Sequence, residues 1–251
     1  MFCQKTFDDL LSLSKRLSLE SWRIGVTLIP KGVRGLFEAM CNVASHTYSF
    51  APAPIQHAAL LAYNNDEDIE RRIEAARWIH REVMTWMWRR LTAAGLQCDQ
   101  PQGGFYIYPS FCGFKDALLS YNYGRGIHTS NELQECLLQD YGVATLPGTV
   151  FGDSEDNLTL RLAGSDYGRE PDCENGALTL CESKLYPRNR NNSHPLYNDK
   201  LPDKEADDFI HKACPNIVEA VKRVELFLAH LCGQEMYRCS PFSPSTSRSA
   251  E

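Results

Sequence analysis

Apolar residues recur at steps of three and four along one long stretch of the chain, residues 66–94. The positions are Ile69, Ile73, Ala76, Ile79, Val83, Met87 and Leu91. This spacing places them on one stripe of a helix. Asn64 and Asn65 can cap its start, and Gly95 can end it. We therefore predict one long helix here, a length typical of a connection between two domains.

Shorter apolar runs on both sides of this helix predict an α/β chain. Strands are expected at 7–14, 24–30, 104–109, 143–146 and 157–163, and helices at 33–44, at 130–140 and after Cys214-Pro215. The segment 45–54 contains two prolines and is expected to be extended or loop-like. In the strand at 157–163, three alternate leucines share one face, so Arg161 points to the opposite face.

Two polar stretches lack any sustained period. Residues 164–207 are rich in Asn, Pro, Arg and Asp and predict a long loop insertion, and residues 234–251 predict a disordered tail. We find no internal repeat.

Composition narrows the class of protein. The chain has 251 residues, of which 43% are hydrophobic and 23% charged, as in an ordinary globular protein. A net charge of -6 argues against nucleic acid or an anionic membrane as the partner. No apolar run reaches the roughly 18 to 20 residues of a membrane span, and the first residues lack a secretory signal. A cytoplasmic location is expected.

The ten cysteines are scattered and form no C-x-x-C pair. Structural zinc sites use ligands paired at short spacing, so we expect no metal site. Reduced, buried thiols such as Cys136 are the preferred interpretation.

Candidate chemistry gathers around Lys15. A lysine amine can form an imine with a carbonyl compound, and here Ser12 and Ser14 flank its approach while Arg23 follows eight residues later. Hydroxyls and a guanidinium are donors that a phosphate group accepts. A lysine beside a phosphate cradle is what pyridoxal phosphate requires.

The order of motifs carries a resemblance. The chain reads Ser12-Leu13-Ser14-Lys15, Trp22-Arg23-Ile24-Gly25, Ser49-Phe50-Ala51-Pro52, Gly103-Gly104-Phe105-Tyr106, Tyr141-Gly142-Val143, Leu146-Pro147-Gly148-Thr149-Val150-Phe151-Gly152 and Leu160-Arg161-Leu162. In this order the motifs resemble the class I/II aminotransferases, which are fold-type I pyridoxal-phosphate enzymes.

The resemblance implies an α/β fold, namely the C-terminal part of the fold-type I transferase fold. Residues 1–64 would be a remnant of the cofactor-binding large domain, with part of its sheet. Residues 65–95 would be the interdomain helix. Residues 96–233 would form an α+β small domain carrying the insertion, followed by the tail.

The resemblance also implies roles for individual residues. Lys15 would carry pyridoxal 5′-phosphate and move a proton at the substrate α-carbon. Ser12, Ser14 and Arg23 would hold the cofactor phosphate, and Arg161 would clamp the α-carboxylate of the substrate. The implied reaction moves an amino group from an L-amino acid to a 2-oxo acid. The segment matching 49–54 lies near the subunit boundary in the family, which implies a homodimer.

The chain departs from the family before Lys15, where only 14 residues stand. In the family, upstream residues bind the phosphate, the ring and the ring nitrogen, so we expect a truncated aminotransferase. Two alternatives stay open: a lyase of the same fold that resembles aminocyclopropane-carboxylate synthase, and a non-catalytic fragment that keeps the small domain for association.

Overall fold

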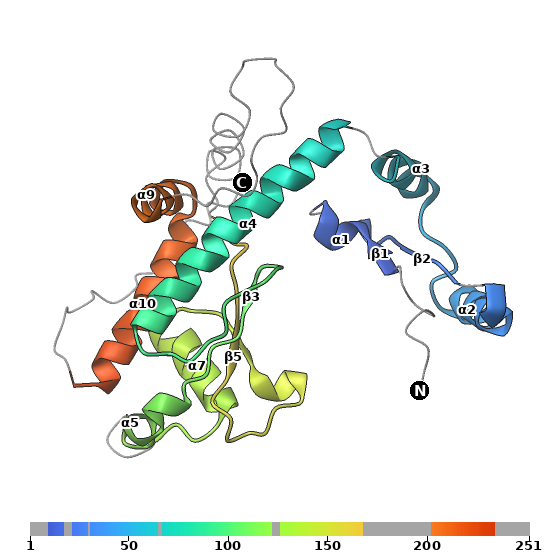
Figure 1. Cartoon of the computed structure of the whole chain (residues 1–251). Helices are drawn as coiled ribbons and strands as arrows, with labels where there is room; N and C mark the ends of the chain where they lie inside the picture. The colour runs from blue at the N-terminus through green and yellow to red at the C-terminus, as the bar shows by residue number, and fades with distance from the viewer. Residues whose placement is uncertain are drawn as a thin grey trace, which may run out of the picture. The chain divides into compact units, whose positions relative to one another are not determined.

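The computed structural model describes residues 10–17, 22–29, 31–64, 67–121, 126–167 and 202–233. These fall into two compact units, Met1–Arg77 and Trp78–Glu251. The helix α4 (Glu67–Ala93) crosses the boundary between them and confirms the long helix predicted from the apolar stripe (Figure 1). Most of the predicted insertion at 164–207 and the whole predicted tail at 234–251 lie outside the described residues.

The first unit is built on a two-stranded antiparallel ribbon. Its elements are β1 (Leu10–Ser12), α1 (Leu13–Arg16), β2 (Gly25–Thr27), η2 (Lys31–Val33), α2 (Arg34–Thr47) and α3 (Ala53–Ala62). The predicted strand at 7–14 is therefore wrong at its end, where α1 begins. The helical turn allows Leu13 to be fully buried against Ala59 and Ala62, which form the small core of this unit.

The segment 45–54 is less extended than its prolines suggested. Helix α2 continues to Thr47, and α3 begins at Ala53 with Pro52 as its N-cap residue and Pro54 in its first turn. The first helical N–H groups have no partner within the helix, so proline costs no hydrogen bond there. The two prolines thus start a helix, which the prediction missed.

The second unit contains a three-stranded antiparallel sheet in the order β3-β5-β4. The strands are β3 (Tyr106–Ile107), β4 (Leu146–Pro147) and β5 (Leu160–Ala163). β3 and β5 confirm the strands predicted at 104–109 and 157–163 in shorter form, whereas β4 shares only Leu146 with the strand predicted at 143–146. Leu158, Leu160 and Leu162 are all buried, as the alternation predicted, and Arg161 lies on the other face.

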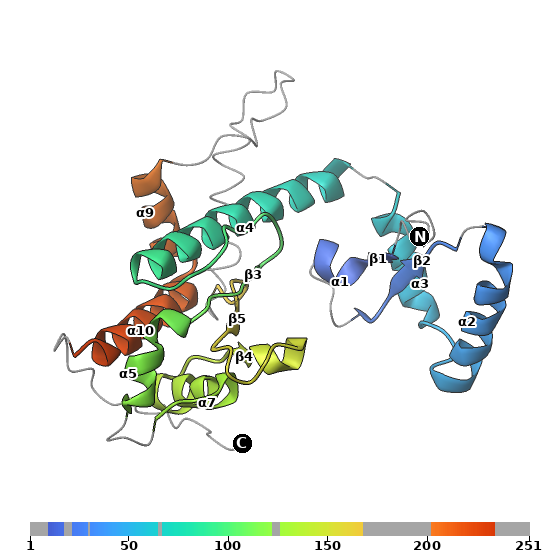
Figure 2. The ribbon, with the colours of Figure 1, turned by 60° about the horizontal axis from the view of Figure 1, so that its bottom comes forward.

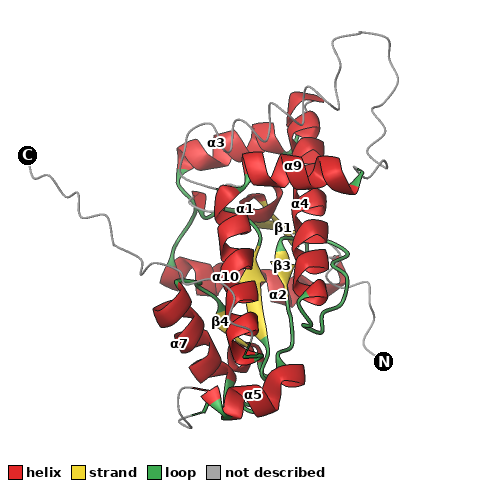
Figure 3. Cartoon of the chain, turned by 90° about the vertical axis from the view of Figure 1, so that its left-hand side faces the viewer, coloured by secondary structure: helices red, strands yellow, loops and turns green. Residues whose placement is uncertain are grey.

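Four more helices lie among the described residues of this unit. They are α5 (Lys115–Leu119), α7 (Ser130–Tyr141), α9 (Asp203–Ala213) and α10 (Pro215–Leu231), with short 3-10 turns at η3 (Cys112–Phe114) and η4 (Gly148–Phe151). Figures 1 and 2 show α10 beside α4, and Figure 3 shows these two helices flanking the strands. Helices α7 and α10 confirm the two helices predicted in this part of the chain.

Both ends of α7 are capped. The side chain of Thr129 accepts a hydrogen bond from the backbone N–H of Glu132, and the Glu132 carboxylate accepts one from the backbone N–H of Thr129. Gly142 ends the helix in the left-handed conformation, with φ of 65°. The reciprocal cap fixes where α7 starts, and Gly142 fixes where it ends, before the segment that leads into β4.

Helix α9 corrects the predicted loop, since it begins at Asp203 within the range 164–207. Its buried residues Ala206, Phe209, Ile210 and Ala213 recur at helical spacing. Phe209 meets Trp78 of α4 edge to face, with ring centroids 5.3 Å apart. The packing explains why this short polar-rich segment is helical despite its many charges.

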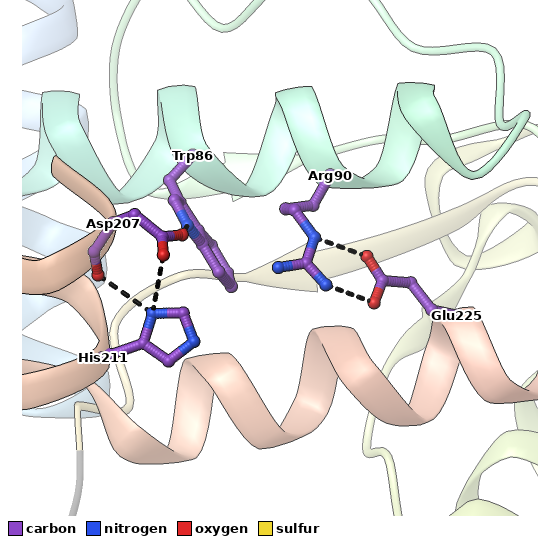
Figure 4. Close-up of polar contacts among 5 residues, drawn as sticks. All are labelled: Trp86, Arg90, Asp207, His211 and Glu225. Carbon is purple, nitrogen blue, oxygen red and sulfur yellow. Dashed lines mark hydrogen bonds and ion pairs between the residues drawn. The ribbon is translucent and has the colours of Figure 1, made fainter. Parts of the chain in front are cut away.

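Polar side chains also join α4 to the two C-terminal helices (Figure 4). Trp86 donates its indole N–H to Asp207 of α9 at 2.8 Å. Arg90 binds Glu225 of α10 through two hydrogen bonds of 2.7 and 2.6 Å. A bidentate pair fixes direction as well as distance, so it sets the relative rotation of α4 and α10.

Two further expectations concern the membrane and the thiols. Within the described residues, no helix is both long enough and apolar enough to cross a membrane. The described cysteines are free thiols. Cys214 is buried, as predicted for these residues in general. Cys136 is only half-buried, and Cys41, Cys112 and Cys232 are exposed, so the expectation of buried thiols is wrong for those three.

Candidate functional site

The lysine segment occupies one end of the β1–β2 ribbon. Ser12 is the last residue of β1 and lies opposite Gly25, the first residue of β2. In an antiparallel pair the end of one strand lies beside the start of the next. Lys15, in the single-turn helix α1, and Arg23, two residues before Gly25, therefore both adjoin this end. The backbone thus gathers all the cofactor-binding candidates of the sequence, Ser14 included, at one place.

Arg23 adopts an unusual backbone conformation. Its φ is +52°, in the left-handed region, and its side chain is exposed. For a residue with a Cβ this conformation costs on the order of 1 kcal/mol. Such strain is concentrated at binding sites, where the surrounding structure holds a side chain in a required direction. The strain at Arg23 is compatible with a role in holding a ligand.

The donors present in this segment fit part of pyridoxal phosphate. A lysine amine suits its aldehyde group, and hydroxyls with a guanidinium suit its phosphate. Protonation of the ring nitrogen calls for a carboxylate, but the described residues 10–17 and 22–29 include no Asp or Glu. The segment therefore fits the aldehyde and phosphate ends of the cofactor and leaves the ring nitrogen to other residues.

Arg161 lies in the second unit, on the central strand β5. Its guanidinium carbon is 4.2 Å from the centre of the Tyr106 ring and 4.6 Å from that of the Phe151 ring. Tyr106 belongs to β3, on one side of β5, and Phe151 to η4, which directly follows β4 on the other side. Aromatic faces attract a guanidinium but accept no strong hydrogen bond from its edge. The N–H edge thus stays available to a planar acceptor.

Among the described residues, no side chain forms an ion pair with the Arg161 guanidinium. Asp153 accepts hydrogen bonds from Thr159 at 2.6 Å and from Tyr108 at 2.7 Å. These two hydrogen bonds hold the pKa of Asp153 below its ordinary value, and the bond from Thr159 has the larger effect. In the described part of the chain, Arg161 therefore forms no structural salt bridge on the strand face. A half-buried guanidinium in this situation can bind a carboxylate from solution.

The surroundings of Arg161 were only partly accessible from sequence. Alternation places Tyr106 and Tyr108 on one face of their own strand, but only the register of β3 with β5 shows that this is the face of Arg161. Phe151 and Asp153 lie in a turn without a period, so no sequence pattern predicted their contacts. Arg161 and the Lys15 segment belong to different units, and each is described within its own unit.

The sequence matches a family model described as aminotransferase class I and II over residues 10–166. It is also similar to an aspartate aminotransferase of Bacillus subtilis (strain 168), with 33% identity over 160 residues. That alignment covers 61% of this chain and 36% of the relative. The chain therefore spans about a third of the length of this curated relative.

Solved structures give the same picture of the fold. An aromatic aminotransferase from Pyrococcus horikoshii OT3 matches with a TM-score of 0.57 and 22% identity, over 88% of this chain and 42% of that one. A mutant aspartate aminotransferase from Thermus thermophilus matches with a TM-score of 0.51 and 26% identity, over 68% of this chain and 41% of that one. The fold is thus the α/β fold of part of an aminotransferase, as the motif order implied.

Proposed function

The chain belongs to the class I and II aminotransferases, and on this premise we propose that it transfers an amino group from an L-amino acid to a 2-oxo acid with pyridoxal 5′-phosphate as cofactor. The observation that carries the proposal is the Arg161 guanidinium, which has two aromatic neighbours and no acidic one among the described residues. A planar guanidinium binds the α-carboxylate of an amino acid through two parallel hydrogen bonds, which both holds and orients the substrate.

The first unit would supply the cofactor contacts. Lys15 would attach the cofactor, while Ser12, Ser14 and Arg23 would donate hydrogen bonds to its phosphate. Pyridoxal phosphate supplies an acceptor for the electrons released at the substrate α-carbon. The free amine of Lys15 is the base that we assign to the proton on that carbon. The strained backbone of Arg23 and the shared end of the ribbon support this assignment.

Assembly, location and domain division are part of the same proposal. The exposed Phe50, in the segment 49–54, supports a homodimer, because large exposed apolar side chains mark association surfaces. Free cysteines among the described residues are compatible with the reducing cytoplasm. We assign residues 1–64 to the cofactor-binding part, 65–95 to the connecting helix and 96–233 to the small domain.

The test is an amino-transfer assay with the full chain. The chain is supplied with pyridoxal phosphate, a panel of ¹⁵N-labelled L-amino acids and a 2-oxo acid, and the label is followed into the new amino acid by mass spectrometry. We expect transfer that is reduced at least tenfold in Arg161→Lys, because an ammonium cannot form the two parallel bonds. Release of a cyclised or eliminated product in place of transfer would support a lyase. A folded chain with no turnover of any kind would contradict the proposal.

A further inference from the structure

Arg161 owes its second aromatic neighbour to a short turn, residues 148–153. The turn is closed by backbone hydrogen bonds from Gly152 to Thr149 and from Asp153 to Gly148, both of 3.2 Å. Phe151 lies within it, and its ring is half exposed. The start of the turn is fixed by the Gly148 N–H, which donates to the Thr159 carbonyl at 2.9 Å. It is also fixed by Thr149 Oγ1, which donates to Asn131 of α7 at 3.1 Å. The end of the turn that follows Phe151 requires a connection of its own.

Asp153 makes that connection. One of its carboxylate oxygens, Oδ2, accepts hydrogen bonds from the hydroxyls of Thr159 and Tyr108, at 2.6 and 2.7 Å. Thr159 lies two residues before Arg161 on the same face of the β5 segment, and Tyr108 lies two residues after Tyr106. The same carboxylate thus ties the turn to the two chain segments that carry Arg161 and its other aromatic neighbour.

The packing around this connection is tight. Gly148 opens the turn, and a Cβ placed on it would overlap Thr159 Oγ1 and approach both Asp153 Oδ2 and Tyr108 OH to 2.8 Å. The ring of Tyr108 also meets that of Phe151 edge to face, with centroids 6.0 Å apart. The absence of a Cβ at Gly148 lets the oxygens of Thr159, Asp153 and Tyr108 lie close together. Their hydrogen bonds fix the distance between the turn and the sheet.

We propose that Asp153 is a positioning residue that latches the turn 148–152 onto β5, so that Phe151 covers the Arg161 guanidinium and only its N–H edge is presented to a carboxylate. This inference rests on the proposed function of Arg161. The position of Phe151 and the contacts that hold it can nevertheless be tested independently of that function. Asp153 does not touch the substrate in this account.

Two substitutions separate the charge of Asp153 from the hydrogen bonds that it accepts. Among the described residues Asp153 forms no ion pair with Arg161, so removing its charge alone should leave the binding of another anion unchanged or slightly stronger. Loss of the latch should weaken binding, because Phe151 leaves the guanidinium and its N–H groups lose their fixed direction. Asp153→Asn removes the charge but keeps an acceptor oxygen, while Asp153→Ala removes both.

The experiment follows the Nε–H signal of Arg161 in the full chain labelled with ¹⁵N-arginine. The signal is assigned by its absence in Arg161→Lys, and its ring-current shift reports the two aromatic faces. The probe is 4-methylpentanoate, a carboxylate without a ring of its own. In Asp153→Ala we expect the ring-current shift to shrink and the affinity for the probe to fall at least fivefold. In Asp153→Asn we expect a nearly unchanged signal and equal or tighter binding.

Asp156→Ala is the matched control, since this exposed carboxylate pairs with Ser154 and with neither Thr159 nor Tyr108. It should leave the Arg161 signal in place. Tyr108→Phe and Thr159→Val each remove one hydroxyl and should each give a shift between those of wild type and Asp153→Ala. An unchanged Arg161 signal in Asp153→Ala, or an equal change in Asp156→Ala, would overturn the inference. A wild-type chain that shows the ring-current shift but binds no probe would instead contradict the proposed role of Arg161.

Discussion

The two units differ in how far they bury their large apolar side chains. In the first unit the core around Leu13 consists of that residue with Ala59 and Ala62, whereas Phe50 remains 73% exposed. In the second unit Phe111 and Phe227 are completely buried. Arg161 is therefore held by a well-packed scaffold, while the lysine segment belongs to a unit in which many large apolar side chains are exposed.

Helices α2 and α7 show the same contrast at closer range. On α2, Phe37, Met40 and Val43 recur at helical spacing but are all exposed. On α7, Leu133 and Leu137 have the same kind of spacing and are fully buried. Periodicity alone thus predicts a helix correctly in both cases. It does not say whether the rest of the chain covers the apolar face of the helix.

The largest expected difference is in core truncation. Phe227→Ala should lower the free energy of unfolding of the second unit by about 3–5 kcal/mol, because it leaves a cavity beside the rings of Phe111 and Tyr141. Phe50→Ala should change the free energy of unfolding of the first unit by about 0.5 kcal/mol or less. Denaturant unfolding followed by circular dichroism measures both. Equal effects would remove the contrast between the units.

Glycine substitutions should have opposite signs in the two units. Gly148→Ala should destabilise the chain by about 1–3 kcal/mol, since its methyl group would overlap the Thr159 hydroxyl. Gly35→Ala should stabilise it by about 0.5–1 kcal/mol, because Gly35 lies in α2 with no atom within 4 Å of an added Cβ. Thermal unfolding of the two variants against wild type decides the signs. Stabilisation by Gly148→Ala would mean that the turn has more room than described.

The ion pairs of the second unit sharpen the comparison further. Glu225→Gln should lower the free energy of unfolding by about 1 kcal/mol, because it weakens the bidentate pair with Arg90 between α4 and α10 (Figure 4). Glu219→Gln is the matched control, since the pair of Glu219 with Arg223 lies within α10 and is more exposed. The control should cost about 0.5 kcal/mol or less. A control as costly as Glu225→Gln would show that the contact between helices adds nothing.

The smallest effect concerns pH. Burial lowers the pKa of His80, whose Nδ1 lies 2.7 Å from the hydroxyl of Tyr167. The neutral ring is thus favoured in the folded chain. Its contribution to stability is complete above the pKa of the unfolded chain and is lost as the pH falls towards the folded-state pKa. An NMR titration of His80, assigned with His80→Gln, should give a lower pKa in the native chain than in urea. A higher native pKa would contradict the burial of this ring.

Much of the second unit could be predicted from the sequence, because its local signals agree with its packing. The stripe of α4, the leucine alternation around Arg161 and the Thr129 cap each indicate the element that forms. Helix α9 was missed because its apolar stripe is short and lies among many charged residues. Only the packing of that stripe against Trp78 of α4 shows why the segment is helical. Sequence periodicity does not report which partner a short helix will find.

The candidate site was predictable in its donors but not in its geometry. Motif order pointed to Lys15, Arg23 and Arg161, and these roles remain predictions. The left-handed backbone of Arg23 and the latch at Asp153 were not visible, because both depend on contacts in turns without a repeating pattern. The domain boundaries likewise remain predictions.

The central claim is that Lys15, in the first unit, is the attachment point of the cofactor. The most direct measurement mixes the purified full chain with pyridoxal phosphate, reduces the mixture with borohydride and locates the modified lysine by peptide mapping. We predict a pyridoxyl group on Lys15 that is lost in Lys15→Ala and kept in Lys115→Ala, a matched change at a surface lysine of the second unit. A folded chain that carries no such group, or carries it on Lys115 as often as on Lys15, would contradict the account.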